Sequence, residues 1–271
     1  MAEECNHNCG GCSQSCDHRI EKAKLNEYSK VKKIIGVISG KGGVGKSLVS
    51  SLLASGLAKK GHRVGILDAD ITGPSIPKSF GIKEKATGEN GIIYPAISKL
   101  GIQIMSANML LENEDDPIIW RGPMIGDLVK QFYTDVLWLN VDYMVVDMPP
   151  GTGDVALTTF QYLPVDGIII VISPQDLVAG IVRKAIKMAN EMNVPILGLV
   201  ENMSYVECPK CAEKIYIYGQ SHVDEIAKQF GLSVLGKIPL REDISQLVDK
   251  GEVEDVDLNN LDDAITKIEN M

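Results

Sequence analysis

Short apolar runs alternate with segments of helical period along most of the 271-residue chain. A continuous apolar run is typical of a strand buried on both faces, whereas apolar residues three and four positions apart mark one side of a helix. The predicted strands are 34–38, 63–67, 101–106, 143–146, 167–172, 195–200 and 232–238. The predicted helices are 47–59, 124–136, 175–192, a helix capped by Ser221 with Asp224 three residues on, and a last helix from about 258. This alternation predicts an α/β fold with a mainly parallel sheet flanked by helices on both faces.

The first 30 residues depart from this pattern. They are polar, rich in cysteine and poor in β-branched residues. We therefore predict two parts: a Cys-rich metal- or cluster-binding segment over 1–30, which ends in a charged linker or short helix, and one α/β domain over 31–271.

Composition narrows the class of function. The net charge is −9, which argues against non-specific binding to nucleic acid or to anionic membranes. No apolar run approaches the roughly 18–20 residues of a membrane span, and we expect no signal peptide. The six cysteines lie in two tight clusters, which is typical of metal or cluster ligands in a reducing compartment. We therefore expect a cytoplasmic protein.

A phosphate-binding loop stands between the first predicted strand and helix. Residues 40–47 read Gly-Lys-Gly-Gly-Val-Gly-Lys-Ser and match the pattern G-x-x-x-x-G-K-[ST]. Strand, Gly-rich loop and helix in this order aim backbone N–H groups at phosphates. Lys46 supplies a positive charge for the outer phosphates, and Ser47 a hydroxyl for Mg²⁺. The predicted nucleotide-binding residues here are Gly40, Lys41, Gly42, Gly43, Val44, Gly45, Lys46 and Ser47.

Carboxylates follow two of the predicted strands. Asp68 and Asp70 come after the strand at 63–67, and Asp147 ends the strand at 143–146. Ligand sites of parallel sheets form at the carboxyl ends of strands. Asp147 fits the position that holds the Mg²⁺ shell, and Asp70 would suit orientation of the attacking water. A cap or a loop salt bridge is the alternative for Asp68 and Asp70.

The segment after Asp147 reads Met-Pro-Pro-Gly-Thr-Gly-Asp. Its two prolines restrict the backbone, whereas its two glycines allow conformations that other residues disfavour. Its glycines, Gly151 among them, let the chain approach a γ-phosphate, and such a segment can order with ATP and relax after hydrolysis. Asp154 can serve as a helix cap or as part of this switch.

Two cysteine sets could hold metal. Cys208 and Cys211 form a C-x-x-C pair, which is half of a tetrahedral site, and the same pair of a symmetry-related copy would complete it. Iron–sulfur cluster, zinc and redox dithiol all remain open for this pair. The second set, Cys5, Cys9, Cys12 and Cys16, can close one site in a single chain, again with iron–sulfur or zinc.

The motifs together resemble a known family. The loop with its extra lysine, Lys41, is similar to the deviant Walker A of the MinD/ParA/nitrogenase-iron-protein class. The segments W-R-G-P-M (120–124), P-P-G-T-G-D (149–154), E-N-M-S-Y (201–205) and C-P-K-C (208–211) resemble the Mrp/ApbC family of iron–sulfur cluster scaffold and carrier ATPases. The resemblance spans about residues 33–250.

This resemblance implies an ATP- and Mg²⁺-dependent ATPase of slow, switch-like turnover that passes clusters to apo iron–sulfur proteins. It implies a homodimer in which Lys41 reaches the partner's nucleotide, and a [4Fe–4S] cluster bridged by Cys208 and Cys211. Asn202 matches the position that reads adenine, and Pro239 one that often lines the base. The N-terminal cysteines would hold a second cluster, although their spacing differs from the eukaryotic form. The chain also departs from many bacterial members, because Ile181 stands where they carry an aspartate.

Other classes of P-loop ATPase remain as alternatives. A MinD- or ParA-like positioning ATPase uses a basic tail or surface, but residues 249–271 hold eight Asp/Glu and two Lys. A zinc-stabilised targeting ATPase needs a long Met-rich apolar insertion, and the ten methionines here are scattered. A nitrogenase-like electron donor does not use a C-x-x-C pair. We expect no binding to nucleic acid or membrane.

Overall fold

The computed structural model describes residues 22–71, 73–111, 122–151, 153–174, 178–257 and 259–271. Its centre is an eight-stranded sheet in the order β12-β9-β8-β1-β7-β2-β6-β5. All neighbouring strands are parallel except β5 and β6, which are antiparallel. The strands are β1 (Val31–Ser39), β2 (Val64–Asp68), β5 (Ala96–Ile97), β6 (Gln103–Met105), β7 (Val141–Asp147), β8 (Gly167–Ile172), β9 (Ile196–Glu201) and β12 (Val234–Lys237). The prediction of a mainly parallel sheet is confirmed.

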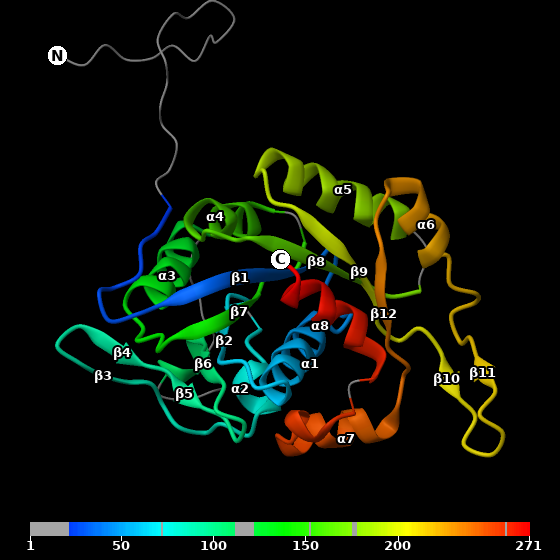
Figure 1. Ribbon diagram of the computed structural model, residues 1–271, viewed down its shortest axis with the longest axis horizontal. Helices are drawn as coiled ribbons and strands as arrows, with labels where there is room; N and C mark the ends of the chain where they lie inside the picture. Colours follow the sequence, from blue (N-terminus) through cyan, green and yellow to red (C-terminus); the bar gives the residue numbers. More distant parts are fainter. Residues whose placement is uncertain (1–21, 72, 112–121, 152, 175–177, 258) are drawn as a thin grey trace, which may run out of the picture.

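Helices cover both faces of this sheet (Figure 1), as predicted. One apolar core packs under α3 (Gly122–Thr134), α4 (Asp154–Tyr162), α5 (Val178–Glu191) and α6 (Val223–Phe230). The other packs under α1 (Lys46–Lys59), α7 (Glu242–Lys250) and α8 (Asp262–Glu269). Side chains of a strand alternate between faces, so Ile34 and Ile38 of β1 enter the first core and Ile35 and Val37 the second. This double burial is why β1 is apolar along its central part.

Several bounds differ from the sequence predictions. The strand predicted at 101–106 is limited to Gln103–Met105, and the helix predicted at 124–136 covers Gly122–Thr134. The last helix begins at Asp262 rather than about 258, after a 3₁₀ turn at Asn259–Leu261. The N-cap position of the helix at 223–230 is His222 rather than the predicted Ser221, and the Asp224 carboxylate pairs with Lys237 instead of completing a capping box.

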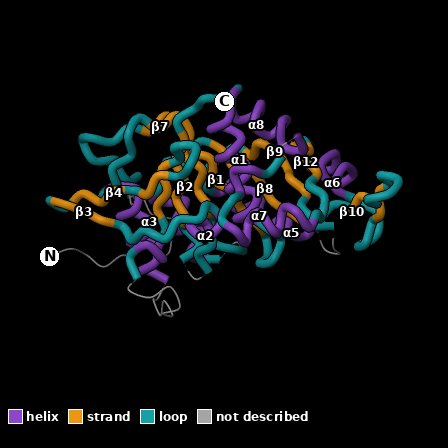
Figure 2. Tube along the Cα trace, turned by 90° about the horizontal axis from the view of Figure 1, so that it is seen from below, coloured by secondary structure: helices purple, strands orange, loops and turns teal. Residues whose placement is uncertain are grey.

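Some short elements were not predicted at all. They are α2 (Ile76–Ser79), α7, strand β5, 3₁₀ turns at Ala107–Met109 and Val253–Asp255, and two hairpins. The hairpins are β3–β4 (Thr87–Glu89 with Ile92–Tyr94) and β10–β11 (Val206–Glu207 with Lys214–Ile215). They project from opposite ends of the molecule (Figure 2). The second one carries Cys208 and Cys211 between its strands.

Residues 22–30 lie against the ends of α3 and α4 without forming a helix. The N–H of Ala23 donates to the carbonyl of Tyr162 (2.8 Å), and the Asn26 side chain donates to the carbonyls of Thr134 and Val136. Cys5, Cys9, Cys12 and Cys16 lie outside the described residues. Among the described helices, none is long and apolar enough to cross a bilayer.

Candidate functional site

The phosphate-binding loop joins β1 to α1, as predicted. β1 ends at Ser39 and α1 begins at Lys46. Two loop glycines adopt the left-handed backbone that other residues disfavour: Gly43 has φ +77° and Gly45 has φ +78°. Gly45 is also crowded, since an added Cβ would lie 2.0 Å from Nδ2 of Asn202. The loop therefore needs glycine at 45 for two independent reasons.

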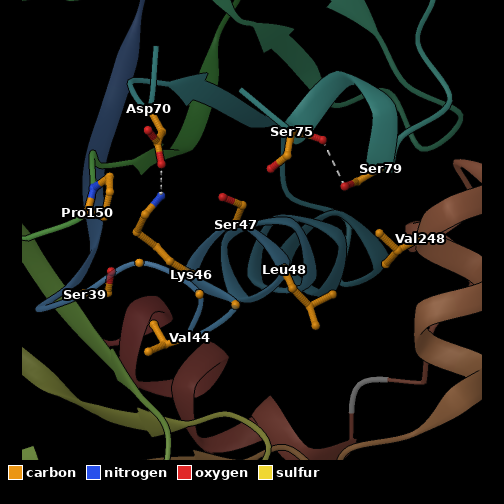
Figure 3. A pocket seen from close by; sticks show the side chains of 13 residues that line it. Ser39, Val44, Lys46, Ser47, Leu48, Asp70, Ser75, Ser79, Pro150 and Val248 are labelled. Carbon is orange, nitrogen blue, oxygen red and sulfur yellow. Dashed lines mark hydrogen bonds and ion pairs between the residues drawn. The ribbon is translucent and has the colours of Figure 1, made fainter. Parts of the chain in front are cut away.

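A cavity of about 340 Å³ opens beside this loop (Figure 3). This is within the range of small-molecule sites. Its wall is formed by the phosphate-binding loop, the start of α1, Asp70, α2 with the residue before it, and one side chain of α7. The lining residues are Ser39, Gly42, Gly43, Val44, Gly45, Lys46, Ser47, Leu48, Asp70, Ser75, Ser79, Pro150 and Val248.

The charged centre of the site is Lys46. Its Nζ lies 2.8 Å from Oδ1 of Asp147 and 3.4 Å from Oδ2 of Asp70 (the latter pair is drawn in Figure 3). Asp147 is fully buried and also accepts hydrogen bonds from the hydroxyls of Ser47 (2.6 Å) and Ser50 (2.7 Å). The structure thus brings together the lysine, the serine and both predicted carboxylates, which come from three separate segments.

Asp68 is buried beneath this centre. Its carboxyl group accepts from the Ser106 hydroxyl (2.9 Å) and from the N–H of Asp70 (3.2 Å). Burial first, and then the neighbouring charge of Asp147, raise the pKa of Asp68 to about 8. Asp68 is therefore a structural support of the site rather than a cap or a loop salt bridge.

The arrangement fits a magnesium–nucleotide. The buried Nζ of Lys46 has ion-pair contacts but no well-aligned hydrogen bond to any described residue, so its donors are available to phosphate oxygens. At Gly42 and Gly43 an added Cβ would meet no atom within 4 Å, so the loop is open there. Ser47 and Asp147 supply the hydroxyl and carboxylate oxygens that Mg²⁺ prefers.

The segment after Asp147 is anchored to the end of β1. The N–H of Met148 donates to the carbonyl of Val37 (3.1 Å), and that of Gly151 to the carbonyl of Ser39 (2.8 Å). Gly151 has φ +86°, and Pro150 lines the cavity. α4 then starts at Asp154. The chain after β7 is thus placed beside the phosphate loop, where a switch is predicted.

The other predicted nucleotide residues lie around the loop. Asn202 is buried and donates from Nδ2 to the carbonyl of Val44 (2.9 Å), so its amide contacts the loop itself. Pro239 is buried and Lys41 half-buried, and neither lines the cavity. Ile181 packs on Gly40, where an added Cβ would lie 2.0 Å from Cγ2. The base-binding roles of Asn202 and Pro239 and the cross-dimer role of Lys41 stay predictions.

The C-x-x-C pair occupies the tip of the β10–β11 hairpin. Cys208 is half-buried, Cys211 is exposed, and both are free thiols. Cys208 bonds through its backbone to Glu213 and Ala212. Hydrogen bonds from the backbone of Lys210 and Cys211 lower the pKa of the Cys208 thiol. Within the described part of the chain no three His, Cys, Asp or Glu side chains gather into a metal site, so the pair supplies two ligands only.

Sequence reasoning missed some contributors. Ser50 was not predicted, although a polar residue one helical turn after Lys46 was an available signal. Ser106 comes from the chain after β6, and Ser75, Ser79 and Val248 reach the cavity from α2, its flank and α7. No local pattern links these residues to the loop.

Comparison with known proteins agrees with this geometry. A ParA family model described as NUBPL iron-transfer P-loop NTPase matches residues 30–270. The chain belongs to this family. This NUBPL-type NTPase is 46% identical over 255 residues to the iron-sulfur cluster carrier protein of Clostridium perfringens. The alignment covers 91% of this chain and 88% of that protein. The resemblance to iron–sulfur carrier ATPases is thereby confirmed.

Solved structures of other P-loop proteins are also similar to this NTPase. A nucleotide-binding protein from Archaeoglobus fulgidus, in complex with ADP and with cobalt, superposes with a TM-score of 0.76 at 42% identity, covering 83% of this chain and 88% of that one. The cell division ATPase MinD of Pyrococcus furiosus superposes with a TM-score of 0.60 at 18% identity, covering 88% and 98% of the two chains, which shows the shared fold.

Proposed function

We propose that this NTPase hydrolyses ATP and carries an iron–sulfur cluster to apo-proteins. The observation that carries the proposal is the pairing of two sites in one chain: a phosphate loop with a buried lysine–carboxylate centre, and an exposed C-x-x-C hairpin. Relatives of more than 40% identity bear the name iron-sulfur cluster carrier protein, which supports the same function here.

The residues of the first site have distinct tasks in hydrolysis. Lys46 neutralises charge on the outer phosphates, and its present contacts with Asp147 and Asp70 exchange for phosphate oxygens. Asp70 orients the attacking water, whose oxygen forms the new bond to the γ-phosphorus while the bond to the bridging oxygen breaks. Mg²⁺, held through Ser47 and Asp147, neutralises phosphate charge when bound. ADP and phosphate leave, and turnover is slow because the step works as a switch.

The second site needs a second copy of the chain. Two thiolates are half of a four-thiolate site, and the described residues offer no further ligands near them. A two-fold axis through the hairpin would bring four cysteines around one [4Fe–4S] cluster. Exposed apolar side chains follow the pair directly, at Ile215, Tyr216, Ile217 and Tyr218, and a partner copy would cover them. Lys41 would then serve the nucleotide of that partner.

The recipients are apo iron–sulfur proteins, and the proposed location is the cytoplasm. A carrier with two free thiols at an exposed tip, one of them of lowered pKa, requires a reducing compartment. Hydrolysis would change the dimer interface and with it the hold on the cluster.

Anaerobic reconstitution with iron and sulfide tests this proposal. Iron and zinc are counted per dimer in the wild type, in Cys208→Ala/Cys211→Ala and in the matched control Lys210→Ala, which leaves both thiols in place. We expect the double variant to lose about four irons per dimer, together with the visible absorbance of a cluster, and the control to keep them. Transfer to an apo-acceptor should fail in the double variant alone.

Tightly held zinc that iron does not displace would contradict the carrier function. The C-x-x-C pair would then be structural, and a zinc-stabilised MinD/ParA-like or targeting ATPase would be the better description. For the nucleotide half, Asp70→Asn should lower kcat while nucleotide binding persists; unchanged kcat would remove Asp70 from the mechanism.

A further inference from the structure

One buried side chain fastens both ends of the segment that carries the cysteines. Glu201, the last residue of β9, is almost completely buried. Its Oε2 accepts from the Ser204 hydroxyl (2.5 Å), just before the hairpin. Its Oε1 accepts from the Ser221 hydroxyl (2.6 Å), just after it. Both ends of the segment 205–220 are therefore anchored to the same carboxyl group, that of Glu201.

The same point adjoins the phosphate loop. Asn202, the next residue, donates from its side chain to the Val44 carbonyl and fills the space beside Gly45. Its own N–H donates to the carbonyl of Ile172 at the end of β8. Asn202 is thus held on both sides, and it connects the phosphate loop directly to the backbone that carries Glu201.

The contacts continue into the hairpin through Tyr205. This buried residue accepts from the N–H of Leu240 at its carbonyl (2.8 Å), and the N–H of Ser204 donates to the carbonyl of Ile238 (2.9 Å). The Tyr205 ring lies 4.2 Å from the Nζ of Lys214 and 6.4 Å from the ring of Tyr216, both on the far side of the cysteine pair. These contacts pack the anchored strand end against the second hairpin strand.

We propose that Glu201 is a positioning residue that holds the C-x-x-C hairpin in a defined orientation to the phosphate loop. Nucleotide binding at the loop then changes the reactivity of Cys208 and Cys211 through this clamp. The inference rests on the proposed function, since it links the nucleotide site of that function to its cluster ligands. Beyond that function, the inference identifies Glu201 as the residue that couples the nucleotide site to the cysteine pair.

Thiol alkylation of the reduced, metal-free protein tests the clamp. Iodoacetamide labelling is followed peptide by peptide by mass spectrometry, without nucleotide and with saturating Mg-ADP. The N-terminal cysteine peptide serves as an internal reference. For the wild type we expect the labelling rate at Cys208 and Cys211 to change about fivefold on nucleotide binding, at the lower end of ordinary coupling between sites.

Variants of the clamp should remove this response. Glu201→Met keeps the length and deletes both acceptors, so the ratio of the two rates should fall to about one. Glu201→Gln retains hydrogen-bonding capacity toward the serine hydroxyls and should restore part of the response. Ser221→Ala releases one end only and remains informative if Glu201→Met fails to fold.

A matched control exists elsewhere in the chain. Glu254 is a buried glutamate that accepts from the Ser98 hydroxyl (2.7 Å), at the opposite edge of the sheet from the cysteines. Glu254→Met should lower stability but leave the response intact. A full response in both Glu201→Met and Ser221→Ala would overturn the inference, as would a wild type that binds Mg-ADP without any change in labelling. Failure of the wild type to bind Mg-ADP would overturn the nucleotide half of the proposed function as well, which calorimetry distinguishes.

Discussion

Lys46 also bears on stability, because its ammonium lies between two carboxylates in a nearly closed site. Its distances of 2.8 Å to Asp147 and 3.4 Å to Asp70 correspond to gross attractions of about 6 and about 5 kcal/mol at an effective dielectric constant near 20. Desolvation of the ammonium offsets much of this, and removal of one partner from a buried pair typically costs about 3–5 kcal/mol. We therefore expect Lys46→Met to lower the free energy of unfolding by about 3 kcal/mol at pH 8.5 in chelator without nucleotide.

The loss should shrink at acidic pH. The loss depends on pH because Lys46 attracts a buried carboxyl group only while that group is ionised, and protonation of the group removes the attraction. Asp68 gives the sign of this pH dependence. Lys46 lowers the pKa of Asp68, so Lys46→Met keeps the Asp68 carboxyl group protonated to higher pH than the wild type does. We expect a loss of about 1 kcal/mol at pH 5.

Urea unfolding followed by circular dichroism at pH 5, 7 and 8.5 measures this. At pH 8.5, thermal unfolding should show a Tm that is lower by roughly 6–12 °C for a domain of this size. This shift should shrink as the pH falls through about 8, where Asp68 takes up its proton. Lys59→Met is the matched control, because Lys59 belongs to the same helix but donates to the carbonyl of Val256 rather than to a carboxylate. A loss that is independent of pH, or no greater than that of the control, would refute the reasoning.

Three further variants address the core, the surface and the loop. Trp138 is fully buried and donates from its indole to the carbonyl of Phe132, so Trp138→Ala should cost about 3–5 kcal/mol in chemical denaturation; less than 1 would mean that the core collapses around the gap. The Arg63 guanidinium holds the pKa of Asp142 below its usual range, so the stability that Asp142 contributes is present above about pH 4 and is lost as the pH falls further. Asp142→Asn should therefore cost about 0.5–1 kcal/mol at pH 7 and clearly less at pH 2, and an equal cost at both would exclude the ion pair as its source. Gly45→Ala forces a Cβ onto Asn202 at positive φ and should weaken Mg-ADP binding about tenfold or more by calorimetry, whereas unchanged affinity would mean that the loop adjusts freely.

The central strands and the phosphate loop could be predicted because their signals are local. β1, β7 and β8 each contain a run of buried apolar residues, and the loop motif names its own residues. Helix α7 was missed although Ile244, Leu247 and Val248 have helical spacing, because they stand among charged residues and only Ile244 is buried. Local sequence patterns thus predict elements that are buried in the core and miss elements, such as α7, that are largely exposed.

The carboxylates show where sequence reasoning ends. Asp68 and Asp70 are two positions apart and look alike in the sequence, but Asp70 lines the cavity whereas Asp68 is buried under Ser106. Which of the two is buried depends on β6, a neighbour in the sheet that is distant in the chain. The contact between Asn202 and Val44 is equally long-range, and no spacing rule could supply it.

The place of β1 in the middle of the sheet has a consequence for the order of synthesis. β1 is the first of the described strands to leave the ribosome, but its two neighbours are β7 and β8: Val31 pairs with Val141, and Ile35 with Gly167. Such distant pairings form slowly, since a long loop must close before they contribute. The phosphate loop extends directly from β1 and is held by Asn202, which follows β9. A nascent chain that stops before β9 would therefore lack a formed nucleotide pocket, and competence to bind ATP would arise only late in translation.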